Sequence, residues 1–176
     1  MALPGHIAEI CRWWLLCALL VAAFGKTFAF ARFRAELAAS FPELRGGVAA
    51  VAPAIVAVEW LLVVLIACGG DPARGGMAAA AALFAAMTLV VAVALVQDRT
   101  VVCRCFGGAG HAVSGYDLLR NGLLIGAAGF GAWMPTVSGV DVFAQIALAA
   151  IGFMLFQLST NLRDIATVLR IEAGLS

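Results

Sequence analysis

The chain is poor in charged residues. Only 12% of its 176 residues are Asp, Glu, Lys or Arg, about half of the ~25% that is usual in soluble domains. Hydrophobic residues make up 64% of the chain, and the mean hydropathy is +1.06. This composition excludes an ordinary soluble domain and indicates an integral membrane protein. The net charge of +1 comes from scattered residues rather than from a basic patch, so we expect no nucleic-acid partner.

Cysteines are also few for a disulfide-based fold. The chain has five, and their apolar setting is unlike that of a secreted disulfide scaffold. Cys11, Cys17 and Cys68 are expected to pack as small apolar side chains, because none has a neighbouring thiol on the same helical face. Cys103 and Cys105 differ from them, since they stand one residue apart in a long loop.

The long apolar runs predict membrane-spanning helices. A span needs about 20 mostly apolar residues, and the runs lack the alternation of a barrel strand. We predict an all-α integral membrane protein with one domain over residues 1–176, a bundle of about five transmembrane helices (a four-helix core plus one). The expected spans are residues 13–31, 48–68, 77–97, 116–134 and 142–160. The segments between them read as breaks, with "GGDPARGG" as a short turn and "MPTVSGVD" as a tight reversal.

The first span has an alternative reading. "WWLLCALLVAAF" could be the apolar core of a signal peptide, with Ala29-Phe30-Ala31 as a cleavage site. Against this, only Arg12 precedes the core, and Lys26 interrupts the approach to the site. Alanine and glycine are frequent in all five runs, which suits close helix packing in a bilayer.

The distribution of positive charge predicts a topology. Arg12 and Arg74 fall on one membrane face, and the other Lys and Arg residues fall on the opposite face. The positive-inside rule then places the N-terminus outside, the C-terminus inside, and Cys103 and Cys105 at the cytoplasmic face.

Two charged residues lie inside the first two predicted spans. Glu59 is near the middle of the second span, where an ionised side chain is costly and by default suggests a function. Lys26, the only lysine, lies late in the first span. A Lys26–Glu59 ion pair would explain how both are tolerated, either as part of a chemical site that relays a proton or as a pair that only fixes helix packing.

The start of the fourth span carries a second polar group. "VSGYDLLRN" reads as a helix N-terminus, with Ser114 as N-cap and Asp117 three residues on. Arg120 and Asn121 follow Asp117 at i+3 and i+4 and share its helical face. Because the chain reverses at each span, these residues, Lys26 and the cysteine loop are expected near the same membrane face.

The stretch "VVCRCFGGAGH" holds the candidate chemistry. Arg104 between Cys103 and Cys105, together with a following helix N-terminus, would favour a thiolate. A disulfide between cysteines one residue apart closes a small, strained ring, and strained, accessible disulfides are the labile kind. Thiol–disulfide exchange is therefore expected. Soft-metal binding by both thiolates and His111, or simple packing of the two cysteines, remain alternatives.

Several motifs together resemble the MauE family of methylamine utilisation proteins, which is grouped with DoxX-like redox-associated membrane proteins. They are "GKTF" with Lys26, "VEWLL" with Glu59, "CRCFGG" from Cys103 to Gly108, and "DLLRN" with Arg120 and Asn121. The middle residue of the cysteine pair is Arg104, where the family pattern leads us to expect a small residue such as glycine. This departure leaves the local loop geometry open.

The resemblance implies a multi-pass protein of the bacterial cytoplasmic (inner) membrane that supports maturation of a periplasmic protein. For MauE itself this is the disulfide-rich small subunit of methylamine dehydrogenase, with a thioredoxin-like protein as redox partner. The layout is also similar to vitamin K epoxide reductase and DsbB-type proteins, which makes quinone a possible cofactor by analogy. A periplasmic substrate conflicts with cysteines at the cytoplasmic face.

We therefore expect a thiol–disulfide oxidoreductase-like protein. Cys103 and Cys105 would carry the exchange and Arg104 would stabilise a thiolate. Lys26 and Glu59 would form a polar floor, and Arg120 and Asn121 would orient the loop. A non-enzymatic membrane assembly factor is the rival hypothesis.

Overall fold

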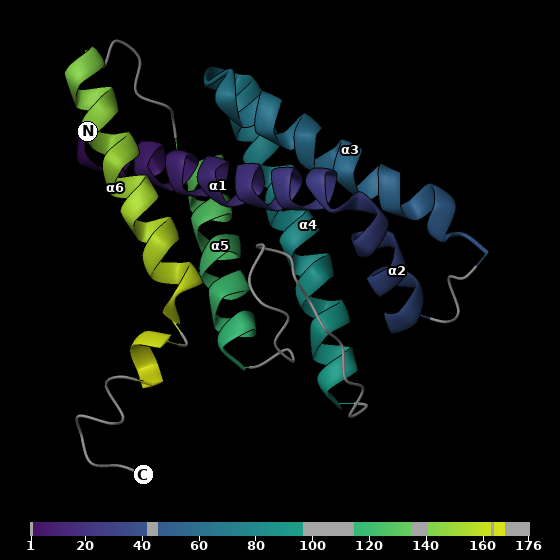
Figure 1. Cartoon of the computed structure of the whole chain (residues 1–176). Helices are drawn as coiled ribbons and strands as arrows, with labels where there is room; N and C mark the ends of the chain where they lie inside the picture. Colours follow the sequence, from purple (N-terminus) through teal and green to yellow (C-terminus); the bar gives the residue numbers. More distant parts are fainter. Residues whose placement is uncertain (1, 42–45, 97–114, 135–140, 163, 168–176) are drawn as a thin grey trace.

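All regular secondary structure in the described part of the chain is helical. The computed structural model describes residues 2–41, 46–96, 115–134, 141–162 and 164–167 (Figure 1). Its helices are α1 (Ala2–Phe28), α2 (Phe30–Ser40), α3 (Val48–Ala67), α4 (Gly70–Val96), α5 (Gly115–Trp133) and α6 (Val142–Thr160). The predicted all-α fold class is confirmed.

Four of these helices are long and apolar enough to cross a membrane. They comprise Leu3–Phe28, Val48–Ala67, Gly70–Val93 and Val142–Thr160, so the chain is a multi-pass membrane protein. Helix α5 coincides with the predicted span 116–134 but is not among them, because its first two turns contain Asp117, Arg120 and Asn121. The count of five spans stays a prediction.

Two helices begin well before the spans predicted for them. Helix α1 starts at Ala2 rather than near residue 13. Its early charges, Glu9 and Arg12, are buried and paired with each other inside the helix, so they do not end it. Helix α4 likewise starts at Gly70 rather than near residue 77.

The expected turn "GGDPARGG" is shorter than predicted. The chain reverses around Gly69 and Gly70, which adopt φ values of +71° and +60°. Glycine has no Cβ and takes this left-handed conformation without a steric penalty. The residues that follow form the first turns of α4, where Pro72 is tolerated because helix N-terminal N–H groups have no intrahelical acceptor.

Helix α2 occupies a segment that the sequence analysis treated as a break. Ala29 separates it from α1, and Arg32 Nε donates to Glu36 Oε1 at 3.0 Å, an i,i+4 pair that supports a helix. None of its residues is buried. The polar composition of this segment therefore reflects an exposed helix (Figure 1).

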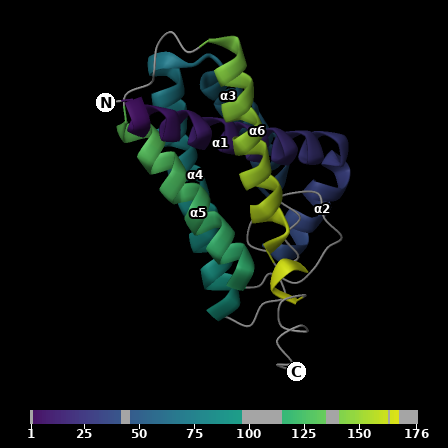
Figure 2. The same cartoon turned by 90° about the vertical axis from the view of Figure 1, so that its left-hand side faces the viewer.

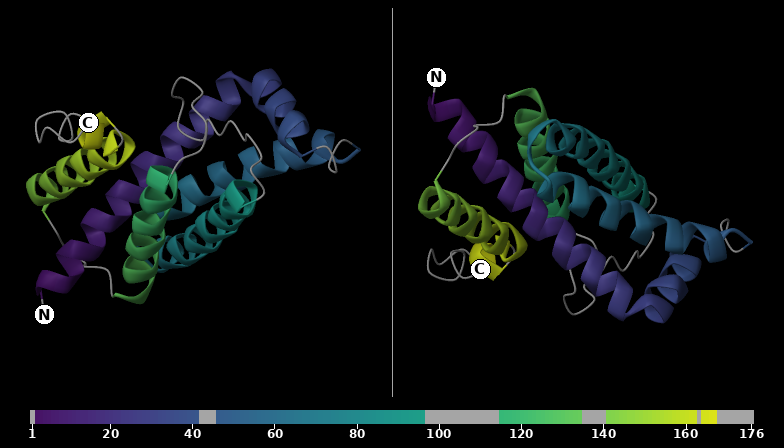
Figure 3. Two further views of the ribbon diagram at one scale, coloured as in Figure 1. Left: turned by 90° about the horizontal axis from the view of Figure 1, so that it is seen from below. Right: turned by 90° about the horizontal axis from the view of Figure 1, so that it is seen from above.

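Helix α1 is the central element. It contacts α3 and α5 on one side and α6 on the other, and α4 packs against both α3 and α5. Figure 3 shows α6 on the opposite side of α1 from α3, α4 and α5. In both Figure 1 and Figure 2, α1 crosses α4, α5 and α6 rather than running parallel to them. The largest fully buried side chains are Leu15, Leu19, Ile66, Met77 and Leu124.

The crossing of α1 and α6 depends on Gly152. A Cβ atom at this position would lie 2.7 Å from Trp13 Cβ and 2.8 Å from the Trp14 backbone nitrogen. Trp13 Nε1 donates to Gln145 Oε1 at 3.4 Å, and Trp14 Nε1 donates to Ser159 Oγ at 3.3 Å. Gly152 lies midway along α6 between these two acceptors. The two helix backbones thus touch at the glycine, with an indole bond on either side.

The Gly152→Ala variant should weaken this crossing. The added methyl group would meet backbone and Cβ atoms of α1 that cannot move aside, and such overpacking costs about 1–3 kcal/mol of unfolding free energy. Gly129→Ala is the matched control, since a Cβ there meets nothing within 4 Å. Unfolding in detergent micelles would measure both variants. Equal stability of the two would contradict the proposed close approach.

Candidate functional site

The predicted cysteine pair lies outside the described residues. Cys103, Arg104 and Cys105 belong to the segment 97–114, as do Arg99, His111 and the predicted N-cap Ser114. The structure therefore leaves the thiol chemistry and the metal alternative as predictions. Within the described ranges, no three His, Cys, Asp or Glu side chains gather in a way that could hold a metal ion.

The predicted ion pair between Lys26 and Glu59 is present. Lys26 Nζ lies 2.6 Å from Glu59 Oε1, and both side chains are only 5% exposed. The two residues come from α1 and α3, which pack against each other. Because charges inside a membrane protein are tolerated when they are paired, this contact explains how both fit into apolar helices. The prediction of the pair is confirmed, but its chemical role is not thereby tested.

Aromatic side chains surround the α1 end of this pair. The Lys26 ammonium lies 5.8 Å from the centre of the Phe33 ring of α2, within the range of a cation–π contact. Directly after the two charged residues in the chain, Trp60 Nε1 donates to Thr27 Oγ1 at 3.1 Å, and the Trp60 ring meets Phe24 edge-on with 4.8 Å between the ring centres. These contacts hold α1, α2 and α3 together around the ion pair.

Glu59 keeps one carboxylate oxygen unused. Oε1 accepts the Lys26 bond, whereas Oε2 is buried and has no hydrogen-bond partner among the described residues. A buried acceptor without a partner costs about 1–3 kcal/mol, and more when it is charged. The pair is thus only half satisfied, which is unusual for a contact that serves packing alone.

The polar residues at the start of α5 occupy the predicted helical face. Arg120 Nη2 lies 3.4 Å from Asp117 Oδ1, and Asn121 is buried at 7% exposure. Asp117 is in the first turn of α5, where a negative charge is favourable. Their expected approach to the cysteine loop involves residues outside the described ranges.

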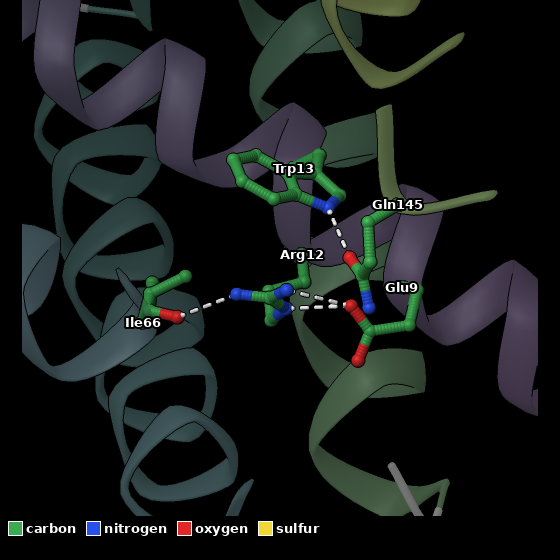
Figure 4. Close-up of polar contacts among 5 residues, drawn as sticks. All are labelled: Glu9, Arg12, Trp13, Ile66 and Gln145. Atoms are coloured by element: carbon green, nitrogen blue, oxygen red, sulfur yellow. Dashed lines mark hydrogen bonds and ion pairs between the residues drawn. The ribbon is translucent and has the colours of Figure 1, made fainter. Parts of the chain in front are cut away.

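A second buried ion pair was missed by the sequence analysis. Arg12 Nε and Nη2 each lie 2.8 Å from Glu9 Oε2, and Arg12 Nη1 donates to the Ile66 carbonyl at 3.2 Å (Figure 4). The guanidinium also lies 4.8 Å from the centre of the Trp13 ring. The signal in the sequence was the i,i+3 spacing of Glu9 and Arg12 within an apolar helix.

Arg12 and Arg74, which the charge distribution places together on one membrane face, each bind a carbonyl group at a helix C-terminus. Arg12 donates to the carbonyl of Ile66 in the last turn of α3. Arg74 Nε donates to the carbonyl of Ala132 at 3.3 Å, in the last turn of α5. Helix C-termini carry carbonyls without intrahelical donors and a partial negative charge. These two arginines therefore have a structural function in this part of the fold.

Removal of one partner of the Lys26–Glu59 pair should destabilise the protein. Lys26→Met leaves an unpaired buried carboxylate, and loss of one partner of a buried pair costs about 3–5 kcal/mol. The double variant Lys26→Met with Glu59→Leu removes both charges and should recover most of this loss. Unfolding free energies of the single and double variants would measure the coupling. A Lys26→Met protein as stable as the wild type would contradict the buried pair.

Glu9→Gln should also destabilise the fold. Arg12 would remain charged and buried while losing its carboxylate, so we expect a similar loss of about 3–5 kcal/mol. Asp71→Asn is the matched exposed control, because the Asp71 side chain is 97% exposed and lies 3.8 Å from Arg74. Its effect should stay within about 0.5 kcal/mol. Thermal unfolding would compare the two, and equal midpoints would argue against the Glu9–Arg12 contact.

Comparison with known proteins identifies the family. No curated protein and no solved structure matches the chain. The family model described as methylamine utilisation protein MauE matches residues 4–134, from the first turn of α1 to the end of α5. The match includes the Lys26–Glu59 pair, the Glu9–Arg12 pair and the segment with Cys103 and Cys105, and it ends before α6. This multi-pass membrane protein belongs to the MauE family of methylamine utilisation proteins.

Proposed function

We propose that this protein exchanges electrons through Cys103 and Cys105 with a thioredoxin-fold partner in the bacterial cytoplasmic membrane. The exchange supports disulfide formation in a periplasmic protein such as the small subunit of methylamine dehydrogenase. The observation that carries the proposal is the Cys103-Arg104-Cys105 motif within a MauE-family chain. The other three cysteines are spread over apolar helix positions, two in α1 and one at the end of α3.

The proposed chemistry is an exchange of one disulfide for another. A thiolate of the Cys103–Cys105 pair attacks a partner disulfide, which forms a mixed disulfide and releases one partner thiol. The second thiol of the pair then attacks the mixed disulfide, which forms the Cys103–Cys105 disulfide and releases the second partner thiol. The pair thereby loses two electrons and two protons, and the partner gains a dithiol. In the opposite direction the same steps run in reverse. Arg104 stabilises the attacking thiolate through its fixed positive charge.

The proposal gives four described residues a supporting role. The buried Lys26–Glu59 pair supplies a polar floor between α1 and α3. Arg120 and Asn121 stand at the start of α5, directly after the cysteine segment in the chain, and their role in the proposal is to orient that segment. These are positioning roles, distinct from the bond changes at sulfur.

Thiol trapping in intact cells tests the proposal. Cys68 is exposed and Cys11 and Cys17 are partly exposed, so all three are first replaced by alanine. An impermeant maleimide should label the remaining pair only after reduction, which would show a resting disulfide on the outer face. Labelling that appears after reduction only in opened membranes would place the pair on the cytoplasmic side instead.

Single serine variants are the matched control. Cys103→Ser and Cys105→Ser should each stop exchange while the bundle stays folded, and one of them should accumulate a mixed disulfide with the partner. If the double serine variant still supports partner maturation, the redox proposal fails and a non-enzymatic assembly factor is favoured. Full labelling without any reductant would likewise contradict a resting disulfide.

A further inference from the structure

We propose that Glu59 binds and releases a proton at Oε2, and that the Lys26–Glu59 pair is the protonation-active member of two buried ion pairs. The inference deepens the proposed function and rests on it, because the proton comes from the thiols of Cys103 and Cys105. It is carried by the difference between the two pairs that helix α1 holds, one near each end. Both are almost completely buried, but Arg12 uses all three of its guanidinium nitrogens in polar contacts, whereas Glu59 Oε2 is buried without a partner among the described residues.

The Glu9–Arg12 pair is built to remain charged. Arginine does not release its proton in proteins. Its guanidinium donates to Glu9 Oε2 from two nitrogens and to the Ile66 carbonyl from the third (Figure 4). Protonation of Glu9 would leave a buried guanidinium without its counter-charge. This pair therefore suits a fixed structural role.

The Lys26–Glu59 pair differs in both partners. Lysine can lose its proton when buried, and one ammonium N–H reaches Glu59 Oε1 at 2.6 Å. The second oxygen, Oε2, is buried without a partner among the described residues. A proton added at Oε2 removes the buried negative charge while Oε1 continues to accept from Lys26. The geometry thus leaves one defined atom at which a proton can bind.

Two other charged side chains, one on α2 and one on α4, are engaged elsewhere. On α2, Arg32 is paired with Glu36. On α4, Arg74 contacts Asp71 and donates to the Ala132 carbonyl. Lys26 is the charged side chain that contacts Glu59 within the described part of the chain. The state of Glu59 is therefore coupled first to Lys26.

Thiol–disulfide exchange requires such a proton acceptor. When an attacking thiol becomes a thiolate, its S–H bond breaks and an O–H bond forms at Glu59 Oε2. When the leaving thiolate is protonated, the O–H bond breaks and an S–H bond forms. In the reduced protein Glu59 thus holds the proton of the thiolate. In the oxidised protein both protons have passed to the partner thiols and Glu59 is ionised, so protons are conserved over the exchange.

Infrared difference spectroscopy tests the proposal directly. Purified protein in lipid vesicles is measured in its reduced and oxidised states, in H2O and in D2O. We expect a protonated carboxylic acid band that shifts in D2O, changes between the redox states, disappears in Glu59→Gln and persists in Asp71→Asn, the exposed carboxylate control. Absence of the band in both states, or its persistence in Glu59→Gln, would overturn the inference.

The same spectra separate this inference from the proposed function. If trapping shows that Cys103 and Cys105 never form a disulfide, the exchange function fails, whereas a band assigned to Glu59 would keep the proton site. If the cysteines cycle and the Glu59 band stays constant between redox states, the function survives and the proton exchange with thiol is refuted.

Lys26→Arg distinguishes a proton site from a structural pair. Arginine keeps the charge, and its planar fork can bind both carboxylate oxygens and so occupy Oε2. We expect the thermal midpoint to stay near the wild-type value while the exchange rate falls at least about tenfold and the Glu59 band is lost. A purely structural pair would leave the rate and the spectrum unchanged in this folded variant.

Discussion

The structure depends on the pairing of buried charges within apolar helices: in the described part of the chain, each buried charged side chain has a partner of opposite charge. Lipid does not drive apolar helices together as water does, so contacts between small residues and polar groups determine the packing. Helix α1 carries most of these contacts. It pairs internally through Glu9 and Arg12, reaches α3 through Lys26, and meets α6 through Trp13 and Trp14. Helices α3 and α6 are positioned by these contacts with α1.

This arrangement separates two kinds of charge that look alike in a sequence. Arg12 and Arg74 end up on the carbonyl groups of helix C-termini, where they compensate the partial negative charge of the helix. Lys26 and Glu59 instead join two different helices and leave an oxygen unused. The first arrangement stabilises helix ends. The second leaves a buried acceptor without a partner among the described residues, and the proposed proton binding rests on that acceptor.

The lengths of the hydrophobic runs were sufficient to predict the long apolar helices. The energetic cost of an unpaired charge in a membrane was sufficient to predict the Lys26–Glu59 contact. The true starts of α1 and α4 were not predictable by the same reasoning. Glu9 and Arg12 lower the local hydropathy, yet they satisfy each other one helical turn apart and the helix continues through them. Helix α2 was missed because its polar residues were read as a break between spans, although most of the segment consists of the strong helix formers Ala, Arg, Glu and Leu. The unused oxygen of Glu59 could not be foreseen, since it depends on how the side chains pack.

The contact between α1 and α6 has a consequence for motion. Gln145 and Ser159 are 14 residues apart on α6, or about 21 Å along a helix axis, whereas their indole partners are adjacent on α1. The close contact at Gly152 lies between these two points. The two indole hydrogen bonds, of similar length, lie on either side of it. If α6 tilted about Gly152, one of the two indole hydrogen bonds would lengthen. If α6 slid along α1, both would break. These contacts therefore oppose a change in the crossing angle of α1 and α6. A change in that angle would alter the environment of Trp13 and Trp14.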